Sequence, residues 1–296
     1  MRRWIFEPDF SLKESCVTIV GLGLMGGSLA LALKERNICR KVVGLVRRTE
    51  VAYEALQAGA VDEATTDPAT ALSEADIVVY STPVRVIIRQ LTEYARFYKA
   101  GAIITDMGST KQEIVQAMAA LPEQVHPVGS HPMCGKEITG LSAAEASLYK
   151  EAPWILSPLE RTPPAALKLV EQMAKNIGAR PQVIPAARHD KLVAAISHLP
   201  YALSAALVLS AQQVAEEDPA LWEVAASGFR DTSRVAGSDV TMMLDILLTN
   251  RAAVGPMLRL AQSQLDSLVK AIDTGDEASL RQLLERAAQQ RRSLYR

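Results

Sequence analysis

The sequence predicts an α/β domain with a parallel sheet, followed by an all-helical domain. The chain has 296 residues, which is more than one domain usually holds. Up to about residue 184, short β-branched apolar segments alternate with helix-like segments, as in a parallel sheet covered on both faces. After Pro185 the patterns are those of long helices. We therefore expect one domain over residues 1–185 and a second over residues 186–296.

The elements expected in the first domain follow one another as repeated strand–helix units. The expected strands are residues 16–20, 41–46, 76–80, 103–105, 153–156 and 181–184. The expected helices are residues 25–34, 51–58, 85–98 and 165–177. In the second domain, Pro200 falls inside the first long helix, which it should kink or end because proline lacks the backbone N–H.

Charge and cysteine content exclude several classes of protein. The net charge is −1 with no basic run, so nucleic acid and anionic membrane surfaces are not expected partners. Three widely spaced cysteines, Cys16, Cys39 and Cys134, fit neither a disulfide framework nor a zinc site, and no metal is expected. Residues 1–10 lack the apolar core of a signal peptide. A reducing cytoplasm is the expected location.

Residues 192–215 contain no Asp, Glu, Lys or Arg and are long enough to span a bilayer. Polar residues nevertheless interrupt the run: Ser197, His198, Ser204, Ser210, Gln212 and Gln213. A helix with this mixture is better interpreted as buried inside protein. We expect it to pack in the helical core of a homodimer.

Gly21, Gly23 and Gly26 form a G-x-G-x-x-G motif directly after a strand and at the start of a helix. Glycines here permit a tight turn and close approach of a pyrophosphate, which the free N–H groups of the helix then bind. In this setting the motif predicts a Rossmann-type dinucleotide site. The alternative is a glycine-rich turn needed only for packing.

The end of the second strand bears on which dinucleotide binds. An NAD site usually has an acidic residue there for the ribose hydroxyl, and this chain has Val46. Arg47 and Arg48 follow and could hold a 2′-phosphate through charge-assisted hydrogen bonds. We therefore expect NADP, with NAD possible; alternatively, the two arginines are only solvated surface residues.

A polar segment, residues 106–111, follows the fourth strand, where sheets of this kind bind ligands. Ser109 could donate a hydrogen bond to a substrate oxygen or to a nicotinamide, or else Ser109 or Thr110 caps the next helix. We also assign Asp106 and Ser81, at the ends of two strands, to the cofactor site.

His131 lies between glycines and a proline, and is our candidate for a proton acceptor beside a hydride acceptor. Three other histidines compete with it. His126 belongs to a turn-like stretch and is expected to be structural or solvated, whereas His189 would only decorate the start of a helix. His198 is either a hydrogen-bonded core residue or part of the site, because kinked helices often line ligand cavities.

Arg230 and Arg234 are four residues apart and would share one helical face, with Asp231 between them. The planar guanidinium group suits a substrate carboxylate. The alternative is an exposed helix with salt bridges on its surface.

Five segments in this order resemble the prephenate/arogenate dehydrogenase family of tyrosine biosynthesis: residues 21–28, 106–111, 129–137, 197–200 and 228–236. The resemblance covers nearly the whole chain. It implies a Rossmann domain followed by a helical domain that forms most of a homodimer interface, with the active site in the cleft between the domains.

The resemblance also implies residue roles. His131 matches the catalytic histidine and Ser109 the serine that hydrogen-bonds the substrate hydroxyl. Arg234 matches the arginine that binds a substrate carboxylate, and Glu137 an acid near the cleft. Tyr201 departs from the family, because many members that use prephenate have histidine at this place. Arogenate is therefore at least as well supported as prephenate.

The activity implied is NADP-dependent oxidative decarboxylation of arogenate or prephenate, giving tyrosine or 4-hydroxyphenylpyruvate, with His198 and Tyr201 near the substrate. Two alternatives stay open, because a fold alone does not define a function. One is another small-molecule reductase on the same two-domain plan, acting on imines or β-hydroxyacids. The other is a non-catalytic NADP-binding sensor.

Overall fold

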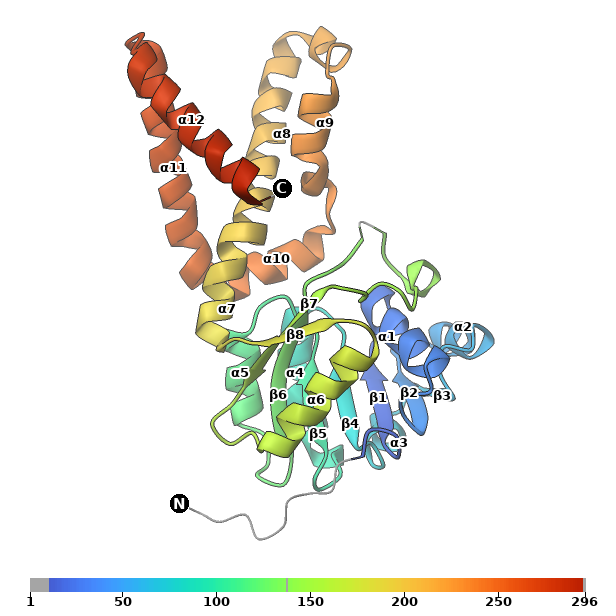
Figure 1. Cartoon of the computed structure of the whole chain (residues 1–296). Helices are drawn as coiled ribbons and strands as arrows, with labels where there is room; N and C mark the ends of the chain where they lie inside the picture. The colour runs from blue at the N-terminus through green and yellow to red at the C-terminus, as the bar shows by residue number, and fades with distance from the viewer. Residues whose placement is uncertain (1–10, 137, 295–296) are drawn as a thin grey trace.

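The computed structural model describes residues 11–136 and 138–294. A sheet domain forms one end of the molecule, and helices rise from it in two arms (Figure 1). The chain leaves the sheet domain after strand β8, Arg180–Val183, and enters the helices with α7, Ala186–Val193.

The sheet has eight strands in the order β3-β2-β1-β4-β5-β6-β7-β8. The other strands are β1 Cys16–Val20, β2 Lys41–Leu45, β3 Glu63–Thr65, β4 Ile77–Tyr80, β5 Ile103–Asp106, β6 His126–Pro132 and β7 Pro153–Pro158. All neighbouring strands are parallel except β6 and β7, which are antiparallel. The predicted fold class is confirmed.

Helices cover both faces of the sheet (Figure 1). They are α1 Leu24–Glu35, α2 Thr49–Gln57, α3 Pro68–Leu72, α4 Val84–Tyr94, α5 Gln112–Ala119 and α6 Pro164–Asn176. One apolar cluster contains Leu29 of α1 and Val170 of α6. A second cluster contains Ile87 of α4 and Ile114 of α5. The sheet domain therefore has an apolar core on each face.

Two strands, β3 and β6, were not expected. Strand β6 pairs with β5 and β7 although it contains Pro127, Gly129 and Pro132, residues that weaken strand patterns. The expectation that His126 belongs to a turn is wrong, because His126 begins this strand and is buried. The buried neighbours on both sides override the weak local propensity.

The helical domain continues from α7 through a π-helical segment, Ala194–His198, into α8, Leu199–Glu217. The remaining elements are short turns at Pro219–Trp222 and Arg234–Gly237, α9 Ser227–Ser233, α10 Val240–Thr249, α11 Arg251–Asp273 and α12 Glu277–Leu294. Pro200 does not end the first long helix. The π-helical hydrogen bonding immediately before Pro200 marks where the regular pattern changes.

Polar contacts join the helical domain to the sheet domain at several points. Asp245 of α10 is buried and accepts hydrogen bonds from the backbone N–H of Arg85 (3.1 Å) and from its Nε (2.5 Å), at the start of α4. Thr249 Oγ1 lies 2.8 Å from Thr110 Oγ1. Asp190 of α7 accepts from the backbone at the start of α5. The domains thus meet at the first turns of α4 and α5.

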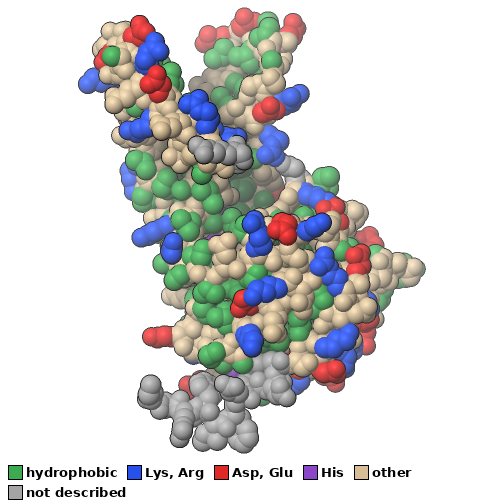
Figure 2. All heavy atoms as spheres, in the orientation of Figure 1, with side chains coloured by type: hydrophobic (Ala, Val, Ile, Leu, Met, Phe, Trp, Pro, Cys, Tyr) green, Lys and Arg blue, Asp and Glu red, His purple; other side chains and the backbone are tan. Residues whose placement is uncertain are grey.

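The helix over Ala186–Glu217 is long and apolar enough to cross a membrane by length and composition, yet only 22% of its most apolar window is buried in the single chain. Large hydrophobic side chains on it are exposed, including Ile196, Leu209 and Val214. Figure 2 shows hydrophobic side chains at the surface of the helical part, including the end of the α8–α9 arm. The expected burial of this helix is therefore not provided by one chain alone.

Candidate active site

The glycine loop has the shape of an anion-binding turn. Gly21 has φ +94°, and a Cβ on Gly26 would lie 2.0 Å from the carbonyl oxygen of Gly21, so neither position accepts another residue without strain. At Gly23 a Cβ would meet nothing within 4 Å, which leaves open space at the start of α1. The first turn of α1 contains no acidic residue, so its free N–H groups and partial positive charge fit a phosphate.

This loop lies where the strand order reverses. Strand β1 has β2 on one side and β4 on the other, and ligands of such sheets bind outside the strand ends at this switch point. Ser81 follows β4, and its carbonyl oxygen would lie 2.9 Å from a Cβ on Gly21. Two of the residues predicted to bind cofactor are thus neighbours.

Arg47 and Arg48 follow β2 and are exposed, whereas Val46 is buried. Arg48 is the N-cap residue of α2. Because β2 is the neighbour of β1, the two arginines lie at the same edge of the sheet as the glycine loop.

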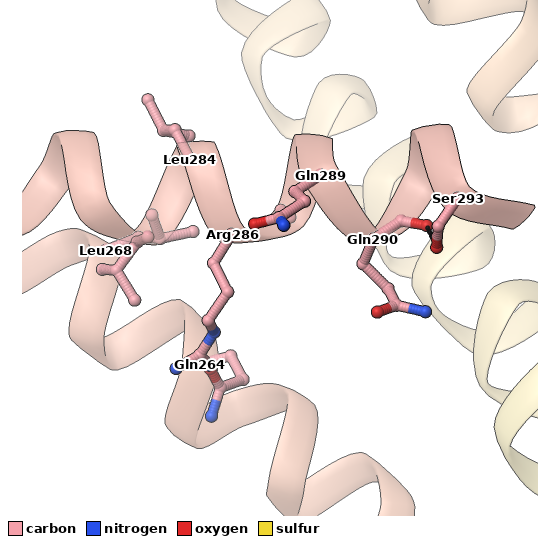
Figure 3. Close-up of a pocket in the computed structure, with 9 residues that line it drawn as sticks. Gln264, Leu268, Leu284, Arg286, Gln289, Gln290 and Ser293 are labelled. Carbon is pink, nitrogen blue, oxygen red and sulfur yellow. Dashed lines mark hydrogen bonds between the residues drawn. The ribbon is translucent and has the colours of Figure 1, made fainter.

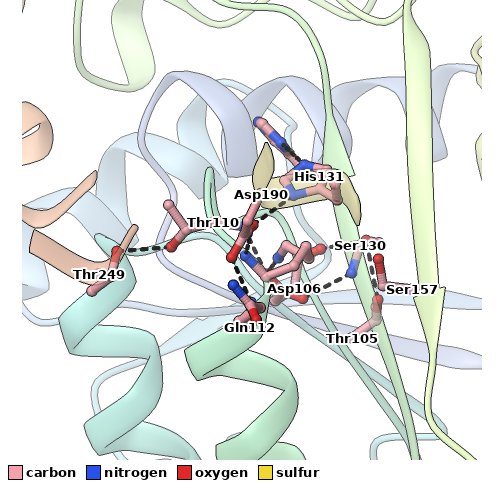
Figure 4. A network of polar contacts seen from close by, with 12 residues as sticks. Thr105, Asp106, Thr110, Gln112, Ser130, His131, Ser157, Asp190 and Thr249 are labelled. Atoms are coloured by element: carbon pink, nitrogen blue, oxygen red, sulfur yellow. Dashed lines mark hydrogen bonds and ion pairs between the residues drawn. The ribbon is translucent and has the colours of Figure 1, made fainter. Parts of the chain in front are cut away.

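His131 lies near the carboxyl end of β6 at the start of a chain of three side chains (Figure 4). Its Nδ1 is 2.9 Å from Nε2 of His189, and His189 Nδ1 is 2.8 Å from the carboxylate of Asp190. An ionised carboxylate only accepts, so His189 Nδ1 carries hydrogen and its Nε2 is left to accept from Nδ1–H of His131. The Nε2 lone pair of His131 is then free to take a proton.

Asp190 is held firmly enough to orient this chain. Its Oδ1 accepts from the backbone N–H of Lys111 (2.7 Å) and its Oδ2 from that of Gln112 (2.9 Å). Burial favours a raised pKa for Asp190, but the hydrogen bonds from His189, Gln112 and Lys111 hold that pKa below its usual value. Asp190, and not Ser109 or Thr110, therefore caps α5.

The surroundings of His131 favour its uncharged form. Burial, followed by the nearby His189, Lys111 and His198, places the pKa of His131 well below its usual value. His131 as a whole residue is partly exposed. A neutral, oriented and accessible imidazole is what general-base chemistry needs.

Asp106 and Lys111 form a fully buried ion pair. The carboxylate of Asp106 also accepts from the backbone N–H groups of Ser130 (2.9 Å) and Gly108 (2.8 Å). Asp106, predicted as a cofactor residue, therefore ties the Ser109 loop to strand β6 beside His131. Ser109 itself is partly exposed.

The helical domain carries the other predicted site residues. His198 is 1% exposed and lies in the π-helical segment, with Tyr201 three residues later and partly exposed. Arg234 is exposed at the start of a short turn, which packs on α8 through a hydrogen bond from Ala236 N–H to Ser204 Oγ (3.1 Å). Glu137 lies outside the described residues.

Arg230 and Asp231 are both exposed, with Nε and Oδ1 3.2 Å apart. This pair fits the alternative of a surface salt bridge on α9. Arg230 therefore has an exposed acidic partner on its own helix.

Sequence reasoning missed three buried residues of this network: His189 as a partner of His131, Asp190 and Asn250. The adjacent acid and imidazole at the start of a helix after Pro185 were a usable signal for the first two. Asn250 had no local signal, since its partners lie about fifty and sixty residues earlier in the chain.

A separate hollow lies between α11 and α12, lined by polar and apolar side chains such as Gln264, Leu268 and Arg286 (Figure 3). It contains none of the predicted site residues. Among residues 11–136 and 138–294, no group of three or more His, Cys, Asp or Glu side chains is placed to hold a metal ion.

Both domains match models of one family. Residues 29–183 match the nucleotide-binding domain of prephenate dehydrogenase, and residues 185–286 match its dimerization domain. The chain belongs to the prephenate dehydrogenase family. This confirms the family and the enzyme class, an oxidoreductase, that the motifs predicted.

Relatives within this family carry several names. Prephenate dehydrogenase of Bacillus subtilis is 34% identical over 80% of the chain, which spans 65% of that protein's length. Cyclohexadienyl dehydrogenase of Zymomonas mobilis is 34% identical over 88% of the chain and 89% of its own length.

Solved structures of the family have the same fold. Prephenate dehydrogenase from A. aeolicus, in complex with hydroxyphenyl propionate and NAD+, superposes with a TM-score of 0.90 at 30% identity, covering 96% of this chain and all of that one. Arogenate dehydrogenase from Synechocystis has a TM-score of 0.82 at 31% identity, covering 94% of this chain and 99% of that one.

Proposed function

We propose that the protein catalyses the oxidative decarboxylation of arogenate or prephenate with NADP, forming tyrosine or 4-hydroxyphenylpyruvate. The observation that carries the proposal is the Asp190–His189–His131 chain, which leaves a lone pair on Nε2 of His131 at the edge of the sheet that holds the glycine loop. Family membership supports the reaction class.

The chemistry of His131 follows from its hydrogen bonds. The substrate carries a hydroxyl at C4 of a cyclohexadiene ring and a carboxylate at C1. A dinucleotide held at the glycine loop would supply the nicotinamide that accepts the hydride leaving C4. Nε2 of His131 accepts the hydroxyl proton as C4 becomes a carbonyl carbon, and His189 and Asp190 stabilise the resulting imidazolium. Loss of the C1 carboxylate as carbon dioxide makes the ring aromatic, so that step needs little help from the protein.

Ser109 and Arg234 would orient the substrate. Ser109, on the loop held by Asp106, donates to the substrate hydroxyl, while Arg234 binds a carboxylate from the helical side. Orientation matters because aligning donor, acceptor and base is the main catalytic task. Tyr201 offers a neutral hydroxyl where a cation would repel the ammonium group of arogenate, which favours arogenate.

The NADP preference rests on Arg47 and Arg48. Their exposure at the end of β2 leaves both guanidinium groups accessible to a 2′-phosphate. The A. aeolicus relative is a complex with NAD+, so the test must include both cofactors.

The active protein would be a cytoplasmic homodimer. The exposed apolar side chains of α8 and the match of residues 185–286 to a dimerization domain support this assembly. Light scattering at micromolar concentration should give twice the mass of the chain; a stable monomer would contradict the dimer.

The deciding experiment measures cofactor reduction by the purified protein with arogenate and prephenate, each with NADP and NAD. We expect turnover of both acids, with kcat/KM higher for arogenate and for NADP. Tyr201→His should shift the ratio toward prephenate. Preference for prephenate in the wild type, with no shift in Tyr201→His, would overturn the arogenate assignment, and inactivity with both acids would favour another reductase of the same plan.

A further inference from the structure

Asn250 lies between α10 and α11 and is 1% exposed. Its Nδ2 donates to the carbonyl oxygen of Asp190 (2.8 Å) and lies 3.1 Å from Nδ1 of His198. Its Oδ1 is buried and has no hydrogen-bond partner among the described residues. Asparagine before a helix commonly caps it through this oxygen, yet Asn250 makes no such bond to α11. The side chain is turned toward the two partners instead.

These contacts determine which way the amide points and where the hydrogen of His198 sits. A carbonyl oxygen only accepts, so the NH2 end of Asn250 must face Asp190. The second hydrogen of the same nitrogen then points to His198, whose Nδ1 must offer a lone pair. A neutral imidazole that accepts at Nδ1 carries its hydrogen on Nε2.

We infer that Asn250 is a positioning residue that fixes His198 as a neutral imidazole with its hydrogen on Nε2, so that His198 serves the site as a hydrogen-bond donor and never as a base or a cation. The consequence for substrate binding rests on the proposed function, whereas the state of the ring does not. The two histidines would then differ in role: Nε2 of His131 accepts a hydrogen bond and Nε2 of His198 donates one.

The surroundings of His198 agree with this state. Burial lowers the pKa of His198 to about 4; Asp190 opposes the shift and His189 adds to it. Both of these groups belong to α7, which packs against the π-helical segment. Protonation of Nδ1 would also set a hydrogen against the NH2 group of Asn250.

An uncharged donor suits the substrates proposed here. It can bind an oxygen of a carboxylate that arogenate and prephenate share. Unlike an imidazolium, it does not repel the ammonium group of arogenate. Asn250 would thereby add to the effect of Tyr201, three residues beyond His198.

Nitrogen NMR of the cofactor-free protein shows directly which ring nitrogen of His198 carries a hydrogen. The chain has four histidines, and the signals of His198 are identified by their loss in His198→Gln. Between about pH 5 and pH 8, where an ordinary histidine titrates, we expect His198 to show an unprotonated Nδ1 and a protonated Nε2 throughout. A protonated Nδ1, or titration in this range, would overturn the inference.

Two variants of similar size test the part played by Asn250. In Asn250→Asp a carboxylate replaces the donor, so His198 should gain a proton on Nδ1 and become charged within the same pH range. In Asn250→Leu the tautomer should no longer be fixed. Thr249→Val is the matched control, because the Thr249 hydroxyl hydrogen-bonds Thr110 and Asp245, and it should leave the His198 signals in place. Unchanged His198 signals in both Asn250 variants would refute the role.

Kinetics then test whether Asn250 acts through His198. Asn250→Leu should lower kcat/KM for arogenate about 10-fold, the scale of one buried hydrogen bond. In a His198→Gln background the same change should lower it by less than about 2-fold, because interacting residues are non-additive. Additive losses would contradict the inference. If His198 carries its hydrogen on Nε2 but the protein turns over neither acid, the inference about His198 stands and the proposed function is wrong.

Discussion

The sheet domain and the helical domain differ in how completely they bury their apolar side chains. The sheet domain has an apolar cluster on each face, with side chains such as Leu29 and Ile87 fully buried. Beyond residue 200, the buried hydrophobic residues of the described chain are Ala215, Met243, Ile246, Val254 and Ala271. Leu209 of α8 and Ile272 of α11 are each 62% exposed. The sheet domain completes its own core, whereas the helical domain presents a surface suited to a second copy.

The proposed site also takes different residues from the two domains. The sheet domain contributes the base, His131, and the loop with Ser109, whereas the helical domain contributes His189, Asp190 and Asn250, which orient the base and His198. Substitutions in the two domains should therefore affect the enzyme in different ways.

The largest effect is expected at the base. His131→Asn should lower kcat about 10²–10⁴-fold, the usual contribution of a general base. Because burial and the neighbouring His189 and Lys111 lower the pKa of His131, the wild type should stay active below about pH 6.5, where a free histidine gains charge. Activity should fall only at lower pH, as the ring is protonated. The pH profile of His131→Asn should lack this decrease. A variant with near wild-type kcat would remove His131 from the chemistry.

Arg234→Ala tests the helical side of the site. Loss of a cation opposite a substrate carboxylate should cost about 2–5 kcal/mol in kcat/KM. NADP affinity, measured by titration, should change little because Arg234 belongs to the helical domain. Arg230→Ala is the matched control, and an equal loss there would show that the effect comes from the segment and not from one guanidinium group.

A pair of leucine substitutions tests the contrast in packing. Leu29→Ala in α1 should destabilise the protein by about 2–5 kcal/mol, as for other buried leucines. Leu209→Glu in α8 should weaken the dimer, so that the mass falls toward that of one chain and the unfolding midpoint is lower at a given protein concentration. Denaturant titrations at several concentrations measure both. An unchanged mass and midpoint in Leu209→Glu would place the dimer interface elsewhere.

The smallest effect is expected at the arginine pair. Arg47→Ala/Arg48→Ala should cost about 1.5–3 kcal/mol in kcat/KM for NADP, through lost charge-assisted hydrogen bonds. The kcat/KM for NAD should hardly change. Equal efficiency of the wild type with both cofactors would reject the preference.

Most of the fold was predictable because each element carries a local signal. The β-branched strand at residues 77–80 and the glycines after β1 indicate a parallel sheet with a dinucleotide loop. Strand β6 was not predictable from local pattern, because its prolines and glycine hide a strand whose pairing with β5 and β7 comes from tertiary contacts.

The site was only partly predictable for a related reason. His131 stands out within its own segment, but the partners of its chain come from α7, 58 residues later. His189 and Asp190 look like the polar start of an ordinary helix until the fold brings them against β6. Asn250 acquires its partners only when α11 packs on the π-helical segment.

The carboxylates of Asp190 and Asp245, which cap α5 and α4, also have a mechanical consequence. Two further contacts between the domains lie beside them, Thr249 with Thr110 and His189 with His131. Because these hydrogen bonds hold the first turns of α4 and α5, we expect any relative motion of the domains to be a rocking about the line that joins the two helix starts. Such rocking would swing the α8–α9 arm toward or away from the glycine loop while His131 keeps its alignment, since His189 and Asp190 lie close to the axis.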